Sequence, residues 1–179
     1  MQKSLYSWFA STPLPSLVED ISIVVGGTGL LLEFLAQVCS SRTGGALSIA
    51  VPFVGNDITV GMKAWEVIPH AKVDFLIVTR HRRDAQIARS QFRLFPWRSL
   101  LICYNRVLHA KVYSFIATKG VRSCLIGSHN LSMSGAHINE EAGVLLRGNP
   151  DDAVDDAIRH CAERIGTLAR AGTELLPGQ

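Results

Sequence analysis

Residues 108–131 place an imidazole, an ammonium and a carboxamide in two neighbouring strand-like segments. His109 and Lys111 are two residues apart, and residues two apart in a strand point to the same face. The second segment ends in Gly-Ser-His-Asn at 127–130, a turn sequence that can present a hydroxyl, a carboxamide and backbone N–H groups at a sheet edge. Glu141 opens the next strand-like segment, where a charged side chain is expected at the edge beside a donor. We therefore predict that these groups surround one anion-binding point.

A phosphodiester is the chemical group that fits such a set of side chains. Lys111 and Asn130 would hold its non-bridging oxygens and oppose the charge that grows in the transition state, with Ser128 beside them in the same turn. His109, in its neutral form, would attack phosphorus. Glu141 would accept the proton on the other ring nitrogen and so stabilise the imidazolium character that develops. These five residues are the predicted catalytic set.

In this order and spacing, the three elements His109-x-Lys111, Gly127-Ser128-x-Asn130 and Glu141 resemble the signature of the phospholipase D superfamily. The similarity is to its small bacterial nuclease branch, whose members have a single His-x-Lys motif. The resemblance implies a metal-independent phosphodiesterase that works through a covalent phosphohistidine, with His109 as the nucleophile and no cofactor. By analogy with family roles, it extends to partner proteins of a bacterial defence or restriction system.

The resemblance also implies a fold, an α/β domain in which a mixed β-sheet is flanked by helices on both faces. We expect a single domain over residues 1–179, with a motif core at 108–148 and an extended or interface-forming segment at 1–20. The family has an aspartate five residues after the lysine, whereas this chain has Ile116. Some nuclease members, including a restriction-endonuclease group, are similar in lacking it.

A phosphohistidine mechanism needs two imidazoles, one that attacks and one that protonates the departing sugar oxygen. General-acid assistance of this kind accelerates a reaction by roughly 10²- to 10⁴-fold. The chain has one His-x-Lys motif and no internal repeat. We therefore predict a two-fold homodimer in which His109 of each subunit contributes to a shared site. The alternative is that His129 or His137 serves as the acid within one chain.

Arginine residues are concentrated between 80 and 98, although the net charge of the chain is only +3. Such a basic surface attracts polyanions, although an arginine-rich solvated helix face is the simpler explanation. If a phosphodiester site lies beside this basic surface, the expected polyanion is DNA or RNA. The aromatic residues in this segment could stack on bases, but core packing is the expected role of each: Phe92, Phe95 and Trp97. The predicted nucleic-acid contacts are Arg80, Arg82, Arg83, Arg89, Arg93 and His129.

Composition excludes several other classes of protein. With 179 residues, 47% hydrophobic and 18% charged, the chain is typical of one globular domain. The four cysteines lack metal-ligand spacing and no other metal motif is present, so we expect free thiols, a reducing compartment and no metal. The apolar stretch 21–38 contains Gly26-Gly27 and Glu33, which favours strand, turn and helix over a membrane span. A cytoplasmic protein without membrane contact is expected.

Strand-like and helix-like patterns alternate along the chain, which is typical of an α/β layered fold. The short links at 106–107 and 118–120 predict hairpins. Asn149 and Pro150 predict the start of the last helix. The expected strands are 21–26, 46–54, 72–80, 99–105, 108–117, 121–128 and 141–148, and the expected helices are 29–41 (capped by Thr28), 57–69, 84–96 and the segment from 149 onward.

Two other functions compete with the nuclease. A phospholipid phosphodiesterase would share the chemistry, but the sequence has no amphipathic or aromatic membrane anchor. A catalytically silent nucleic-acid-binding or scaffold module would retain the fold alone, and Ile116 is the main argument for it.

Overall fold

The computed structural model describes residues 22–26, 29–61, 64–138 and 141–176. Thr28 and the segment 1–20, for which the sequence predicts a helix cap and an extended or interface-forming arm, lie outside these ranges. Within them, no helix is both long and apolar enough to cross a membrane.

Eight strands form one mixed sheet in the order β1-β7-β6-β5-β2-β3-β4-β8. The pairs β2–β3 and β3–β4 are parallel, and all other neighbours are antiparallel. The strand bounds are β1 Ser22–Gly26, β2 Gly45–Ala50, β3 Val73–Thr79, β4 Ser99–Tyr104, β5 Val112–Ala117, β6 Arg122–Gly127, β7 Gly143–Gly148 and β8 Thr173–Glu174.

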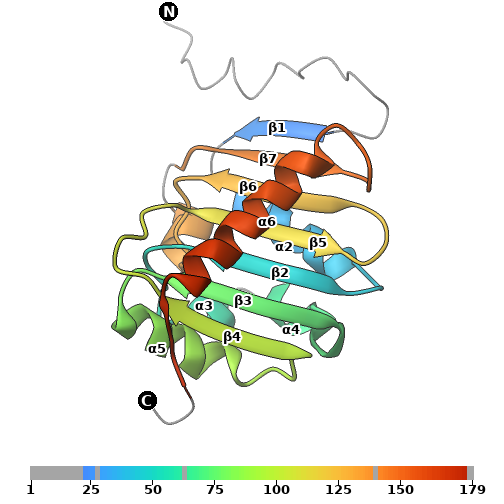
Figure 1. The fold of residues 1–179 in the computed structure, drawn as a ribbon. Coiled ribbons are helices and arrows are strands. Elements are labelled where there is room, and N and C mark those ends of the chain that lie inside the picture. The colour runs from blue at the N-terminus through green and yellow to red at the C-terminus, as the bar shows by residue number, and fades with distance from the viewer. Residues whose placement is uncertain (1–21, 27–28, 62–63, 139–140, 177–179) are drawn as a thin grey trace, which may run out of the picture.

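Helices cover both faces of the sheet, as the α/β prediction requires (Figure 1). A single long helix, α6 (Asp155–Arg170), crosses one face, and the other helical segments lie mainly on the opposite face. Their bounds are α2 Leu30–Ser40, α3 Ile58–Gly61, α4 Ala64–Val67 and α5 Arg82–Phe92, with a 3₁₀ turn at His70–Lys72 and a π turn at Ser134–Ile138.

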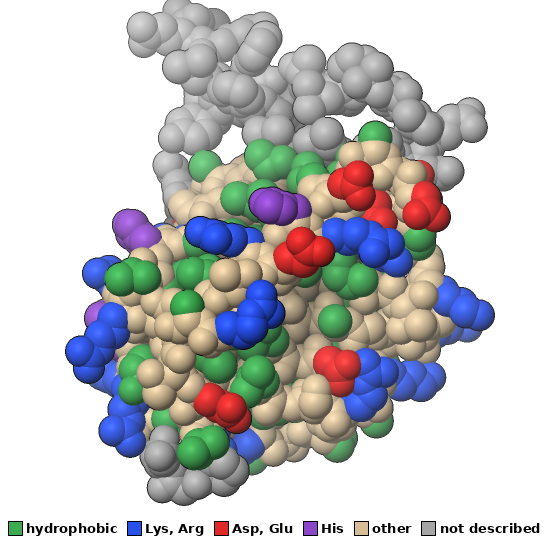
Figure 2. Space-filling model, viewed as in Figure 1, with side chains coloured by type: hydrophobic (Ala, Val, Ile, Leu, Met, Phe, Trp, Pro, Cys, Tyr) green, Lys and Arg blue, Asp and Glu red, His purple; other side chains and the backbone are tan. Residues whose placement is uncertain are grey.

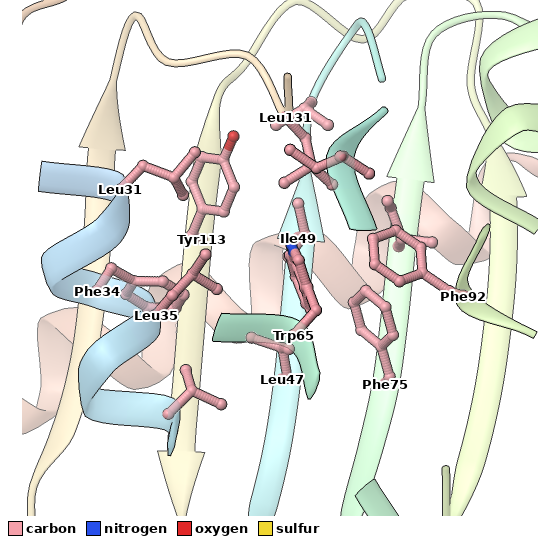
Figure 3. Packing of buried hydrophobic residues seen from close by; sticks show 14 of the residues in the cluster. Leu31, Phe34, Leu35, Leu47, Ile49, Trp65, Phe75, Phe92, Tyr113 and Leu131 are labelled. Carbon is pink, nitrogen blue, oxygen red and sulfur yellow. The ribbon is translucent and has the colours of Figure 1, made fainter. Parts of the chain in front are cut away.

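The larger core fills the space between the sheet and helices α2 to α5. Trp65 contacts Phe75 and Phe92 there, with ring centroids 6.1 and 4.8 Å away. Tyr113 belongs to the same core, and its hydroxyl points toward the end of the sheet at which Leu131 lies (Figure 3). This packing holds in place the ends of the strands from which the loops with the candidate catalytic residues extend.

Several strands share one end of the sheet, which we call the carboxyl edge. Strands β1, β2, β3, β4 and β6 end there, whereas β5 and β7 begin there, at Val112 and Gly143. The segments after β2, β3 and β6 and those before β5 and β7 therefore meet, on the left in Figure 1.

Residues 99–105 and 108–117 do not form the predicted hairpin, because β4 and β5 are not neighbours in the sheet. The hairpin predicted between 108–117 and 121–128 is confirmed, since β5 pairs with β6. Strands β3 and β2 lie between β4 and β5, so residues 105–111 cross about 14 Å of the carboxyl edge. Leu108 is buried beside Ile165 under α6, and the Asn105 amide donates to the Leu168 carbonyl at 3.1 Å. Because of these contacts, the chain reaches β5 from the α6 side, and the strand begins at Val112 rather than at residue 108.

Three predicted helices differ from the structure. The segment 57–69 forms two short helices, α3 and α4, instead of one. The helix predicted at 84–96 is α5, which ends at Phe92 because the chain turns back and the Trp97 indole donates to the Phe92 carbonyl at 2.8 Å. The last helix begins at Asp155 rather than at Asn149 and Pro150, since Asp151 has a left-handed φ of 72° that a helix cannot contain.

Candidate active site

Ser128 and Glu141 are in direct contact at the carboxyl edge. The Ser128 hydroxyl donates to the Glu141 carboxylate. The same hydroxyl oxygen accepts from the Ala142 amide at 2.9 Å, and the Ser128 amide donates to the Ala142 carbonyl at 2.9 Å. The turn after β6 is thus fastened to the segment that leads into β7. Two predicted catalytic residues, 13 positions apart in the chain, lie together.

Lys111 lies beside this turn because the β5–β6 ladder continues past Val112. The Gly127 amide donates to the Lys111 carbonyl at 3.2 Å, so Lys111 is the next position in the register that pairs Val112 with Ile126. By the alternation of a strand, its side chain belongs to the same face as Tyr113 and Gly127. Lys111 is half-buried.

His109 lies two residues before Lys111, in the extended segment that precedes β5. The imidazole is exposed, whereas Leu108 next to it is buried under α6. An exposed ring at the start of a strand is accessible to a large substrate such as a polymer. The contact predicted between His109 and Glu141 stays a prediction.

Asn130 follows in the turn after β6. Its backbone carbonyl accepts from the Ser132 amide at 2.9 Å. Its side-chain oxygen is buried and has no hydrogen-bond partner among the residues that the structure describes. This oxygen is an acceptor, whereas a phosphate oxygen would be bound by the N–H₂ donors of the same carboxamide.

His129, predicted as a nucleic-acid contact, is 1% exposed, and this prediction is wrong. Its ring lies over Gly127 and Gly143, where a Cβ added to either glycine would be 3.1 Å from a ring atom. The turn directs this side chain inward because two glycines leave room for it. The ring of the other alternative acid, His137, lies outside the described side chains.

Tyr113 supports this turn from below, a role that the sequence reasoning missed. Its hydroxyl donates to the His129 carbonyl at 3.0 Å. Burial, and secondarily the charge of Glu141, raise the pKa of Tyr113 well above its ordinary value of 10.0. The phenol therefore remains protonated and can donate throughout the physiological pH range. The position of Tyr113 two residues after Lys111 was the available signal, because it places both side chains on one face.

The predicted nucleic-acid-binding arginines do not form one group. Arg82 and Arg83 are exposed at the start of α5, next to the carboxyl edge, and Arg80 is half-buried just before them. Arg89 and Arg93 lie at the other end of α5, where the Arg89 guanidinium donates to the Leu175 carbonyl at 3.0 Å. Figure 2 shows Lys and Arg side chains along the left margin, where α5 and the carboxyl-edge loops lie, and acidic side chains at the upper right, near the start of α6.

The aromatic residues that follow α5 pack inside, as expected. Phe92 is fully buried, and Phe95 stacks on His70 with ring centroids 4.5 Å apart. Trp97 completes the cluster at 4.5 Å from the same His70 ring. Phe95 and Trp97 are half-buried and pack against the core, so core packing is the role that the structure supports for these rings.

Ile116 lies away from the site. It is the last residue but one of β5 and pairs with Ala46, near the start of β2. It is five positions along the chain from Lys111, which is a distance of about 17 Å in an extended strand. The family aspartate that Ile116 replaces would therefore not reach a substrate at the carboxyl edge, which weakens the argument for a silent module.

The chemistry of these groups is that of cationic and amide donors, an imidazole and a carboxylate. Within the described ranges, no three His, Cys, Asp or Glu side chains are grouped as metal ligands. All four cysteines are free thiols.

The chain matches no protein-family model and no curated protein. Among solved structures it is similar to a phospholipase D family member, Nuc from Salmonella typhimurium, with a TM-score of 0.57 and 17% identity over 87% of this chain and 99% of that one. It is also similar to NucT from Helicobacter pylori, with a TM-score of 0.56 and 13% identity over 87% of this chain and 100% of that one.

Proposed function

We propose that this chain, which has the fold of the phospholipase D family, is a metal-independent phosphodiesterase that cleaves DNA or RNA. The observation that carries the proposal is the Ser128–Glu141 hydrogen bond, because it fastens the turn with Asn130 to the segment before β7. Lys111 is tied to the same turn through Gly127, and His109 is two residues away. The two similar structures, by their names, are consistent with this class of enzyme.

The reaction has two displacements at phosphorus. In the first, an imidazole nitrogen of His109 attacks, a P–N bond forms, and the bond from phosphorus to the departing sugar oxygen breaks. That oxygen takes a proton from a second imidazole. In the second, water attacks phosphorus, gives its proton back to the second imidazole, and the P–N bond breaks.

The other residues stabilise charge during these steps. Lys111 and Asn130 bind the non-bridging oxygens, whose negative charge they offset more strongly in the transition state. Glu141 supports the positive charge on His109, and Ser128 holds the carboxylate in place. We assign the second imidazole to His109 of another subunit. Of the two single-chain alternatives, His129 is buried away from the surface, and His137, whose side chain is not described, is distinguished from the dimer by subunit mixing.

The test is cleavage of labelled single- and double-stranded DNA and RNA in EDTA. The wild-type protein is expected to cleave at least one of them, and His109→Ala to lose more than about 10³-fold in rate, as expected when a nucleophile is removed. His160→Ala is the matched control, since His160 is an exposed histidine on α6. Cleavage that requires an added divalent metal, or that survives in His109→Ala, would contradict the proposal. Vesicles of phosphatidylcholine, assayed in parallel, distinguish a lipid phosphodiesterase.

A further inference from the structure

Phe53 and His81 form an exposed pair of rings next to the candidate active site. Phe53 follows β2 and His81 follows β3, and their ring centroids are 6.3 Å apart with planes inclined by 39°. Phe53 is 46% exposed. The other phenylalanines that the structure describes pack in the core or against it: Phe34, Phe75, Phe92, Phe95 and Phe115.

The backbone around Phe53 is held on both sides. On one side, Val54 forms a bridge with Leu131, and the Gly55 amide donates to the Leu131 carbonyl at 2.8 Å. Leu131 directly follows Asn130. Phe53 is therefore one residue from a contact with the turn that carries a proposed phosphate ligand.

On the other side, the loop is fastened to the start of α5. The Val54 amide donates to the buried Asp84 carboxylate at 3.2 Å, and the Arg80 amide donates to the Pro52 carbonyl at 3.3 Å. These bonds fix the ring pair relative to both the active-site turn and the exposed Arg82 and Arg83. A ligand that uses this surface does not have to order the loop first, which favours affinity.

The chemistry of this surface is that of a single nucleic-acid strand. Aromatic rings stack on unpaired bases, and guanidinium groups bind the phosphates between them. Bases of a duplex are already stacked on one another and are not available to a protein ring. We propose that Phe53 and His81 form a base-stacking subsite, which makes single-stranded nucleic acid the preferred substrate. This inference rests on the proposed function.

The test measures binding of the full chain to a fluorescent single-stranded oligonucleotide with hydrolysis-resistant linkages, and to its duplex, in EDTA. The wild type is expected to bind the single strand more tightly than the duplex. Phe53→Ala should weaken single-strand binding by about 5- to 150-fold, the effect of losing one stacked base, and Phe53→Trp should retain it. Leu94→Ala is the matched control, because Leu94 is 72% exposed just beyond α5.

Salt dependence separates stacking from charge. Phe53→Ala should leave the slope of log affinity against log salt unchanged, whereas Arg83→Ala should reduce its magnitude by about 0.7 for the single strand, because one phosphate contact is lost. A changed slope in Phe53→Ala would contradict stacking. Equal affinity for single strand and duplex, or unchanged binding in Phe53→Ala, would overturn the subsite while leaving the proposed function intact.

Two further outcomes are informative. If Phe53→Ala converts a dimer into monomers in analytical ultracentrifugation, the ring belongs to a subunit contact, and the subsite is wrong. If the wild-type protein binds neither nucleic acid, the subsite and the proposed function both fail, which distinguishes this result from the loss of the subsite alone.

Discussion

At the scale of single residues, the turn after β6 presents its polar side chains because its middle residue is buried. The His129 ring occupies space left by Gly127 and Gly143, which pair across β6 and β7. Its carbonyl is held by the Tyr113 hydroxyl. The residues on either side are more exposed: Ser128 is exposed and Asn130 is half-buried. The buried imidazole thus positions Ser128 and Asn130, which we assign to holding Glu141 and to binding phosphate, respectively.

We predict that Gly127→Ala destabilises the protein and disrupts the site. The new methyl group would lie 2.4 Å from the Ala142 carbonyl oxygen and 3.1 Å from the His129 ring, so both must move. Overpacking of this kind costs about 1–3 kcal/mol. Urea unfolding measures the loss. Gly148→Ala is the control, because its Cβ would meet only ordinary contacts at 3.5 Å; equal effects of the two substitutions would contradict this account.

At the scale of elements, α6 is fastened to the sheet by a buried ion pair at its first turn. The Arg122 guanidinium on β6 donates to both oxygens of Asp155, at 2.8 and 2.6 Å, and Arg159 one turn later donates at 2.7 Å. Burial raises the pKa of Asp155, but the bonds from Arg122 and Arg159 outweigh it, and the pKa lies below the ordinary 3.8. Because α6 also buries Leu108, this attachment supports the segment that carries His109.

Asp155→Asn should cost about 3–5 kcal/mol near neutral pH, since it leaves the buried Arg122 without a counter-charge. The carboxylate stabilises the fold above its ordinary, unfolded-state pKa of 3.8. This contribution is lost as the pH falls through the lower folded-state pKa, so the difference between wild type and variant should shrink in acid. Urea unfolding over a pH series measures it.

Arg159→Ala is the matched control, with an expected loss of at most about 1 kcal/mol, because Arg159 is 48% exposed. A difference between wild type and Asp155→Asn that stays constant into acid would refute the electrostatic explanation.

At the scale of the whole molecule, the sheet brings five separate segments to one edge, and among the described side chains of the motif core only the imidazole of His109 is exposed. A phosphohistidine mechanism uses two imidazoles, one that attacks phosphorus and one that protonates the leaving oxygen. A two-fold axis at the carboxyl edge would provide the second from another subunit, with the same surface on both sides.

Subunit mixing tests this arrangement. Wild type and His109→Ala are unfolded together in equal amounts and refolded, so that subunits combine at random. If each site needs both imidazoles, only wild-type homodimers are active, and about one quarter of the wild-type rate remains. A remaining rate of one half would instead mean that each subunit works alone. Wild type mixed with His160→Ala, which is expected to keep the full rate, controls for losses on refolding.

Local patterns in the sequence were sufficient for the α/β class, for most strand positions and for the order of the motif residues. The alternation in β5 and β6 and the short link between them predicted a hairpin that the structure confirms. Such patterns work because side-chain periodicity and turn residues act over a few neighbouring positions. They also indicated that Ser128 and Glu141 would lie near each other at a sheet edge, where the structure has them hydrogen-bonded.

Only the tertiary structure decided which strands are neighbours and which side chains turn inward. The insertion of β2 and β3 between β4 and β5 depends on contacts such as Leu108 with α6, made between residues far apart in sequence. The burial of His129 depends on Gly143, a glycine from another strand. The exposure of Phe53 depends on the hydrogen bonds that hold its loop to Asp84 of α5 and to Leu131. Local periodicity carries no information on these contacts, because each partner is chosen when the chain packs.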